Sequence, residues 1–465
     1  MNFDRKNSVR ALVFSGVLSL MLATPGNAVA QATNPFLGSV PAGQPSGEPL
    51  SLTLDEAITR GLRNNLGVIL SGQQRAQARG ARLSQLQSLL PEVNFNAQEA
   101  VAQIDLPAQG LRMSGFPTVL GPFGYTDVRA SLNWSLVDVA SLRNYLAAKH
   151  NFSAAELTAE DAHDLVVLTV GNAYLLALAD ESRIESALAQ VATSKVSLDQ
   201  AEANHKAGTA PLIDELRARV DYQTLEQQLI VARNAFEKDK LALARTIGLP
   251  LEQNITLADK TPYGFFDQVD VEAVVRQAKT NRKDLAALFE QARASKEQRK
   301  AATAERYPTV KFAGDYGDIG TTLAHSHGTG EASGTLSVPL FKEYALRGHA
   351  EQAQAQLNTA EDKLSDAQAQ VDADVRDALL DIASSQKQVE VARSSIALAG
   401  EVLSQAQQRY ANGVNDNLAV SQAQQAVAQA DEQYVASLYR HNVAKLTLAR
   451  ALGAGAEYKN YLGGK

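Results

Sequence analysis

Apolar residues recur every seven positions along one stretch of the chain, residues 350–410. Leu357, Leu364 and Val371 hold the first register, and a second register begins at Ile382 after a shift of four positions. An apolar residue every 3.5 positions forms the seam of a coiled coil, because it keeps one stripe of the helix facing a partner helix. The inserted four residues locally straighten the supercoil. The second register comprises Ile382, Val389, Ile396, Leu403 and Tyr410. The pattern predicts a helix about 90–100 Å long.

Other segments alternate between apolar and polar residues with a period of two, which is typical of strands with one apolar face. The clearest runs from Asp127 to Leu136, and a weaker one follows Pro91. About ten residues of such alternation is the length with which a tilted strand crosses a bilayer. The sequence therefore predicts β-hairpins over residues 91–137 and 308–341. Either strand of the first hairpin, taken alone, fits a soluble hairpin with one buried face equally well.

The same order of elements occurs twice. Asn64 and Pro91 match Asn281 and Pro308 at an offset of 217, and the glycines that end the long helices match at an offset of 205. Each half contains two helices, two strands, a very long helix, a glycine turn and a returning long helix, which indicates an internal repeat. The predicted organisation begins with a signal peptide at 1–30 and a flexible leader at 31–51. The first repeat, 52–248, contains a long helical hairpin at 139–248, and a connector at 249–270 follows. The second repeat, 271–453, contains a long helical hairpin at 342–453, and a C-terminal tail at 454–465 ends the chain.

Composition narrows the class of protein. Basic residues lead into the apolar run 11–23, and Ala28-Val29-Ala30 follows, which is the pattern of a secretory signal peptide cleaved after Ala30. There are 0 cysteines, so the chain has neither disulfides nor the cysteine of a lipoprotein. The net charge of −7, without a dense basic cluster, gives no nucleic-acid footprint. No phosphate loop or zinc signature supports an enzyme or a cofactor site.

Past the signal peptide, no uninterrupted run of about 18 apolar residues predicts a membrane-spanning helix, so any crossing of a membrane must be made by strands. The predicted number of strands, four per chain, is too small to close a membrane barrel. Two chains would supply eight strands and three would supply twelve, and only the larger barrel begins to leave a water-filled lumen.

The sequence resembles the TolC family of outer-membrane efflux proteins. The markers are the duplicated order of the Asn64-Asn65 break, Leu90-Pro91, Pro339–Phe341, the glycines at the helix turns and the close at Ala451–Gly453. The resemblance implies a mainly α protein with a small transmembrane β part. It implies a homotrimer with a 12-stranded β-barrel in outer-membrane lipid and an α-helical tunnel in the periplasm. It further implies a passive exit duct for small molecules or proteins, docked to a periplasmic membrane-fusion adaptor and an inner-membrane transporter.

The resemblance also assigns candidate residues at the turns of the long helices, which form the mouth of the tunnel. The polar links that the family forms between helices near the mouth fall on Asp214, Tyr410 and Asn415. The third of these positions is often basic in the family. Asp416 or Glu215 is a candidate substitute for the family's acidic ring. The acidic ring itself falls on Ala419 and Gln422 and is not supported. Alternatively, Asp214 and Asp416 only favour helix N-termini, and Tyr410 fills the seam. The expected adaptor contacts are Gly208, Thr209, Gly413 and Val414.

The sequence departs from the family pattern after the asparagine pair, and it leaves open a possible metal site and an alternative function. The proline that often follows the asparagine pair is replaced by Leu66 in one half and by Arg282-Lys283 in the other, which puts the local kink in question. His325 and His327 lie in the second hairpin loop, where two ligands of one type are a weak metal signal compared with a solvated loop. The rival function is a periplasmic coiled-coil adaptor without a pore, which would normally carry one helical hairpin and soluble β-domains.

Overall fold

A computed structural model describes residues 34–111, 115, 117–267, 269–412 and 417–462. The predicted signal peptide, 1–30, lies outside the described residues. Pro35–Lys465 forms one compact unit. Its first-half elements are α1 (Leu54–Asn64), α2 (Leu66–Gln87), β2 (Glu92–Asp105), β3 (Val119–Val137), α3 (Val139–Lys206) and α4 (Leu212–Ile247). Its second-half elements are α5 (Val271–Asn281), α6 (Lys283–Ala304), β5 (Thr309–Gly320), β6 (Ser326–Ser337), α7 (Glu343–Ala411) and α8 (Asn417–Ala451).

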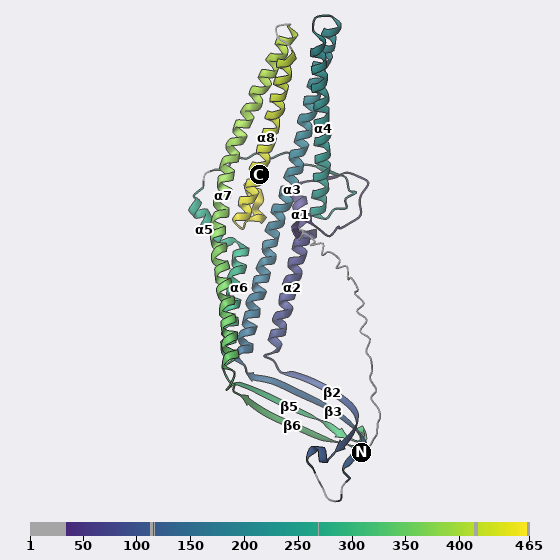
Figure 1. Cartoon of the computed structure of the whole chain (residues 1–465), viewed down its shortest axis with the longest axis vertical. Coiled ribbons are helices and arrows are strands. Elements are labelled where there is room, and N and C mark those ends of the chain that lie inside the picture. Colours follow the sequence, from purple (N-terminus) through teal and green to yellow (C-terminus); the bar gives the residue numbers. More distant parts are fainter. Residues whose placement is uncertain (1–33, 112–114, 116, 268, 413–416, 463–465) are drawn as a thin grey trace, which may run out of the picture. The chain divides into compact units, whose positions relative to one another are not determined.

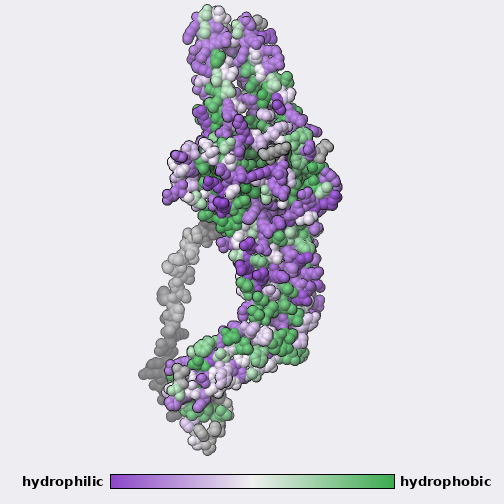
Figure 2. Space-filling model, turned by 180° about the vertical axis from the view of Figure 1, so that it is seen from behind, coloured by the Kyte–Doolittle hydropathy of each residue, from purple (hydrophilic) through white to green (hydrophobic). Residues whose placement is uncertain are grey.

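The two strand pairs join into one four-stranded antiparallel sheet in the order β2-β3-β5-β6. The register aligns apolar residues across the sheet, with Phe95 opposite Ala130 and Ala130 opposite Tyr316. Because alternate residues point to opposite faces, one face is mostly apolar. Phe95 and Tyr316 on that face are 73% and 72% exposed. Figure 2 shows a hydrophobic area over the sheet and the adjoining helix ends. Within this unit, the sheet has an uncovered apolar face and two unpaired edges.

The long helices form two helical hairpins. We call α3 and α4 the first hairpin, and α7 and α8 the second hairpin. Within the unit, Figure 1 shows both hairpins ending at the same side, away from the strands. The predicted seam of α7 is buried at Leu357, Val371 and Val389, and the register shift at Ile382 is buried too. The mainly α fold with four amphipathic strands, predicted from the sequence, is confirmed.

A belt of smaller elements surrounds the middle of the long helices. We define the belt as α1, α5, β1 (Leu50–Leu52), β4 (Ile255–Leu257) and α9 (Tyr458–Leu462). One apolar cluster gathers Leu52, Val166, Tyr174, Ile247 and Tyr458, and another gathers Val275, Val375 and Leu448 with their neighbours. Figure 1 shows α1 and α5 beside the long helices at this level. The two largest apolar clusters of the unit therefore lie at the level of the belt, between the belt elements and the long helices.

The described part of the expected flexible leader, from Pro35 onward, is held by the belt. Val40 N donates to Asn64 O at 2.9 Å, and β1 pairs in parallel with β4 of the connector. Leu52 is 0% exposed. The alternation of Leu50 and Leu52 explains why this segment is ordered. The strand buries one face and pairs its backbone groups with Ile255–Leu257. From Pro35 onward, the leader that was expected to be flexible over 31–51 is thus ordered against the rest of the unit.

The described part of the tail expected at 454–465 forms α9 of the belt and packs into its apolar core. Tyr458 and Leu462 are each 5% exposed. The Tyr458 hydroxyl donates to Asp55 Oδ1 at 2.9 Å, and Lys459 Nζ lies 2.7 Å from the same oxygen. The tail therefore ties the second half of the chain back to α1.

Among the described residues, α3 is long and apolar enough by length and composition to cross a membrane. Its apolar window is 56% buried inside the unit. Val166, Val170 and Tyr174 of α3 belong to the apolar cluster that also contains Leu52 and Tyr458. The apolar run in α3 is therefore accounted for by its burial in the core that the belt surrounds.

Candidate pore mouth and the contacts between the hairpins

The turn between α3 and α4 follows a glycine cap. Gly208 has φ +74°, a left-handed conformation that a residue with a Cβ adopts at a cost. Thr209 N donates to Asn204 O at 2.9 Å, and Thr209 Oγ1 donates to the same oxygen at 3.0 Å. Gly208 and Thr209 therefore lie at the tip of the first hairpin, as the sequence predicts. Gly413 and Val414, expected at the other tip, lie outside the described residues.

Asp214 lies in the first turn of α4 and is 4% exposed. Its carboxylate oxygen Oδ1 is 3.9 Å from Arg217 Nη1 of the same helix. Its backbone carbonyl accepts a hydrogen bond from Asn417 Nδ2 at 3.3 Å. Asn417 begins α8, so this contact joins the two hairpins next to their tips. Sequence reasoning missed Asn417, although it lies in the short polar run that separates the tip glycine from the apolar positions of α8.

Tyr410 lies near the end of α7 and is 7% exposed. It packs in a small apolar cluster with Ala406, Val420 and Ala423. Its hydroxyl is buried and has no hydrogen-bond partner among the described residues. The structure gives no contact between Tyr410 and Asp214 in that part of the chain. Asn415 and Asp416, the other two candidates, lie outside the described residues.

Further polar contacts join the hairpins between the tips and the belt. Gln424 Nε2 of α8 donates to Ser197 Oγ of α3 at 3.0 Å. Arg183 of α3 binds both carboxylate oxygens of Glu432 of α8 at 3.0–3.2 Å. A groove with a volume of about 890 Å³ lies between α3, α4 and α8. Its walls are mainly glutamine and alanine side chains, including Gln190, Gln227, Gln228, Ala232, Ala428, Gln429 and Gln433.

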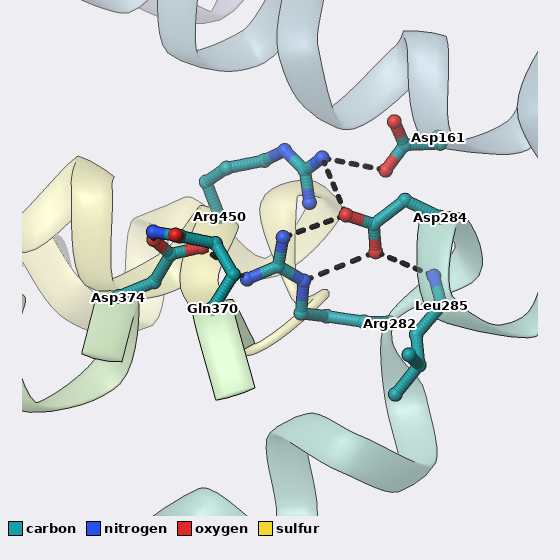
Figure 3. Close-up of polar contacts among 7 residues, drawn as sticks. All are labelled: Asp161, Arg282, Asp284, Leu285, Gln370, Asp374 and Arg450. Atoms are coloured by element: carbon teal, nitrogen blue, oxygen red, sulfur yellow. Dashed lines mark hydrogen bonds and ion pairs between the residues drawn. The ribbon is translucent and has the colours of Figure 1, made fainter. Parts of the chain in front are cut away.

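At the belt, an ion network joins four helices (Figure 3). Arg282 Nε and Nη2 donate to Asp284 at 3.0 and 2.6 Å, and Arg282 Nη1 donates to Asp374 Oδ2 of α7 at 2.6 Å. Arg450 Nη2 of α8 lies 2.7 Å from Asp161 Oδ1 of α3. Burial raises the pKa of Asp161 to about 6, against the opposing effect of Arg450. At the level of the belt, the network therefore holds α7 and α8 of the second hairpin against α3.

Arg282 also answers the question raised by the missing proline. Asn65 separates α1 from α2 in the first half, where its side chain accepts a hydrogen bond from Gly67 N at 2.9 Å. Arg282 separates α5 from α6 at the matching position, with φ −63° and ψ 122°. Both breaks therefore exist without a proline. An extended backbone conformation makes the break in each half, although different side chains hold it.

The histidines of the second hairpin loop do not gather with other ligands. His325 Nδ1 lies 3.1 Å from Thr322 Oγ1, and His327 pairs with Ile319 in the sheet. Among the described residues, no group of three or more metal-binding side chains occurs. The weak metal signal at His325 and His327 gains no support.

Comparison with known proteins identifies the class. The family model described as outer membrane efflux protein matches residues 70–249 and 274–454, which is most of the chain. The chain is 22% identical over 415 residues to the toluene efflux pump outer membrane protein TtgF of Pseudomonas putida, covering 86% of this chain and 83% of TtgF. The chain belongs to the family of outer membrane efflux proteins. The resemblance to the TolC family is confirmed.

Solved structures agree with the fold. The outer membrane protein VceC of Vibrio cholerae is 18% identical, with a TM-score of 0.77 over 86% of this chain and 96% of VceC. The outer membrane channel CmeC of Campylobacter jejuni is 16% identical, with a TM-score of 0.77 over 93% of this chain and 95% of CmeC. Because the chain belongs to the outer membrane efflux protein family, it is a non-enzymatic efflux channel of the outer membrane with a helical extension in the periplasm, and it works as a component of an efflux pump.

Proposed function

We propose that three copies of this chain assemble into one channel. The observation that carries this proposal is the open sheet, in which β2 and β6 each leave one edge unpaired. Unpaired backbone groups are not tolerated in lipid, so each edge needs a strand from a neighbouring copy. Three copies supply twelve strands, which is enough for a water-filled lumen. The exposed apolar side chains Phe95 and Tyr316 then face lipid.

The polar face of the same sheet supports a water-filled interior. Arg129 Nε donates to Asp127 at 2.8 Å, and Arg129 Nη1 donates to Asp315 at 2.7 Å across two strands. Charged side chains on the lipid face of a barrel are costly, whereas they are tolerated in the lumen. The ion pairs therefore favour an inward-facing polar surface.

The tips of the two hairpins form the periplasmic mouth of this channel, where a membrane-fusion adaptor docks. Gly208, Thr209, Gly413 and Val414 are the proposed adaptor contacts. Opening is controlled by the proposed mouth residues Asp214, Tyr410, Asn415 and Asp416, together with Asn417. The buried Tyr410 hydroxyl has no partner within the described chain, which supports an acceptor supplied by the assembly, because buried hydroxyls are normally bonded.

The cargo is proposed to be small organic molecules, moved by an inner-membrane transporter through a passive duct. The matches over most of the chain to proteins described as efflux pump components support this cargo class. The rival of a pore-free periplasmic adaptor is set aside, because the family model matches both repeats.

The cargo is tested in cells that lack their own outer-membrane efflux component. The cells express this chain with its pump and adaptor, and the accumulation of an apolar fluorescent dye is measured alongside the export of a reporter polypeptide. Lower dye accumulation without polypeptide export is the expected result. Polypeptide export with unchanged dye accumulation contradicts the proposed cargo.

A further inference from the structure

The two β-hairpins of the sheet pair their strands in the same register. Glu92 of β2 lies opposite Asn133 of β3, and Thr309 of β5 lies opposite Ser337 of β6. Thr309 comes 217 positions after Glu92, and Ser337 comes 204 positions after Asn133. The same two offsets relate the following pairs of the two hairpins as far as Ile319. Each residue of one hairpin therefore has a matching position in the other.

The boundary between the two repeats lies inside the sheet, where β3 pairs with β5. Leu132 lies opposite Gly314 there, and Trp134 lies opposite Phe312. This boundary joins the second strand of one hairpin to the first strand of the next. A boundary between two copies would join the same kinds of strand, because β6 and β2 lie at the two edges of the sheet (Figure 1). The inner boundary therefore gives the register expected between copies.

The two offsets turn the inner pairs into pairs between copies. The first places Leu336 of β6 opposite Ala97 of the next copy. The second places Val338, which follows β6 directly, opposite Phe95. Phe95 and Ala97 lie on the apolar face of the sheet, and Leu336 lies opposite Val310 on that same face. A register shifted by one position would set Leu336 against the polar face of β2, so the alternation agrees with the transferred register.

On the polar face, the inner boundary is crossed by an ion pair. Arg129 of β3 donates to Asp315 of β5 at 2.7 Å, and it also donates to Asp127 of its own strand at 2.8 Å. The guanidinium therefore binds one carboxylate on each side of the boundary. Charge-assisted bonds of this kind are stronger than neutral ones.

The boundary between copies lacks that ion pair. The position that matches the arginine is Ser333, and the carboxylate across the boundary is matched by Gln98. The carboxylate on the same strand is matched by Glu331. Neither β2 nor β6 contains a lysine or an arginine. Backbone pairing, apolar contacts and neutral side chains therefore have to hold β6 against β2 of the next copy.

We propose that β6 pairs with β2 of the next copy in the register of β3 with β5, with Leu336 opposite Ala97, across a boundary without an ion pair. The inference rests on the proposed assembly of three copies, and it adds which residues meet and by what chemistry. Ion pairs across strands then lie inside each copy only. The particle separates into whole copies along β6 and β2, while β3 stays paired with β5.

Disulfide formation between copies tests the register. The chain has 0 cysteines, and within one copy β2 and β6 are three strand spacings apart, about 14 Å. A disulfide between Ser337→Cys and Asn96→Cys, which the register places opposite each other on the polar face, therefore forms only between copies. The matched controls combine Ser337→Cys with Asn94→Cys or with Gln98→Cys. These diagonal pairs lie about 7–8 Å apart, beyond the reach of a disulfide.

Oxidation of the extracted particles should link copies about fivefold more through Asn96→Cys than through either control. A stronger link through a control overturns the register. A particle with the mass of three chains and no link through Asn96→Cys also overturns it, because β6 and β2 then do not meet as proposed. A particle with the mass of one chain contradicts the proposed assembly itself.

A second experiment transfers the missing ion pair to the boundary and needs no disulfide. Ser333→Arg combined with Gln98→Asp copies the inner pair, and the matched control combines Ser333→Arg with Asn94→Asp, which the register places farther along β2. The temperature at which the particle separates into single chains in denaturing detergent is measured. It should be about 2–4 °C higher with Gln98→Asp than with Asn94→Asp. Equal temperatures overturn the proposed register.

Discussion

Arg282 Nη1 lies 2.6 Å from Asp374 Oδ2, so the residue that separates α5 from α6 also binds α7 (Figure 3). The matching residue of the first half, Asn65, binds backbone carbonyls of Phe36 and Thr246 instead. The same break between two helices is thus held by neutral hydrogen bonds in the first repeat and by ion pairs in the second.

Arg282→Asn, which copies the first half, is expected to destabilise the protein. It leaves the carboxylates of Asp284 and Asp374 without their main cation, and removing one partner of a buried ion pair costs about 3 kcal/mol. Thermal unfolding in mild detergent, followed by circular dichroism, measures the loss. Arg347→Asn is the matched control, because Arg347 is 71% exposed in its side chain and pairs with Glu351 of its own helix. Equal losses in both variants would contradict the account of the network.

Asp161→Asn is expected to change how stability depends on pH. Burial raises the pKa of Asp161 to about 6 from 3.8. The folded state therefore binds a proton more tightly than the unfolded state, and the resulting stability is lost as the pH rises from 3.8 to about 6. The wild-type protein should lose up to about 3 kcal/mol from this group across that window. Asp161→Asn should lack this component, and the exposed control Asp362→Asn should retain it.

The glycine turns should differ in their tolerance of a side chain. Gly248 has φ +78°, and an added Cβ would lie 2.5 Å from Asn64 Cβ. Gly208 has φ +74° with open space around it. Gly208→Ala should therefore cost about 1 kcal/mol from backbone strain alone, and Gly248→Ala should cost more. Gly80→Ala, inside α2 with open space, should stabilise by about 0.5–1 kcal/mol. Denaturant unfolding ranks the three variants.

Asn417→Ala should open the mouth without unfolding the protein. It removes the amide that binds Asp214 O across the hairpins, and a single neutral bond contributes about 1 kcal/mol. Single-channel conductance should rise. Asn412→Ala is the control, because the Asn412 amide donates to Gln408 O of its own helix at 2.8 Å. An equal rise in both variants would argue against the link between the hairpins.

Tyr410→Phe tests whether the buried hydroxyl has a role in the assembly. The proposal expects conductance to rise, because the variant removes only the group that lacks a partner within the described chain. Tyr344→Phe, on a side chain that is 93% exposed at the other end of α7, should change nothing. Unchanged conductance in Tyr410→Phe would assign Tyr410 to the packing of the seam.

The sequence was sufficient for features set by local periodicity. The seam at Leu357 and Val371 and the alternation around Asp127–Leu136 predict the helix and the strand directly, because burial of one face follows the period of the element. The glycine tip at Gly208 is equally local, since few other residues adopt its backbone conformation.

Contacts between distant segments were harder to predict. Arg183 and Glu432 lie on two helices, 249 positions apart in the sequence, and no spacing in the sequence relates them. Leu50 and Leu52 are too short a run to signal a strand until Ile255–Leu257 is beside them. The role of Asn417 depends likewise on which carbonyl the fold brings within reach of its amide.

The most direct test of the central claim combines the mass and the conductance of the protein extracted from outer membranes in mild detergent. The account predicts a particle with the mass of three chains that inserts into planar bilayers and conducts ions. A single chain that remains in the soluble periplasmic fraction and forms no pores would contradict it.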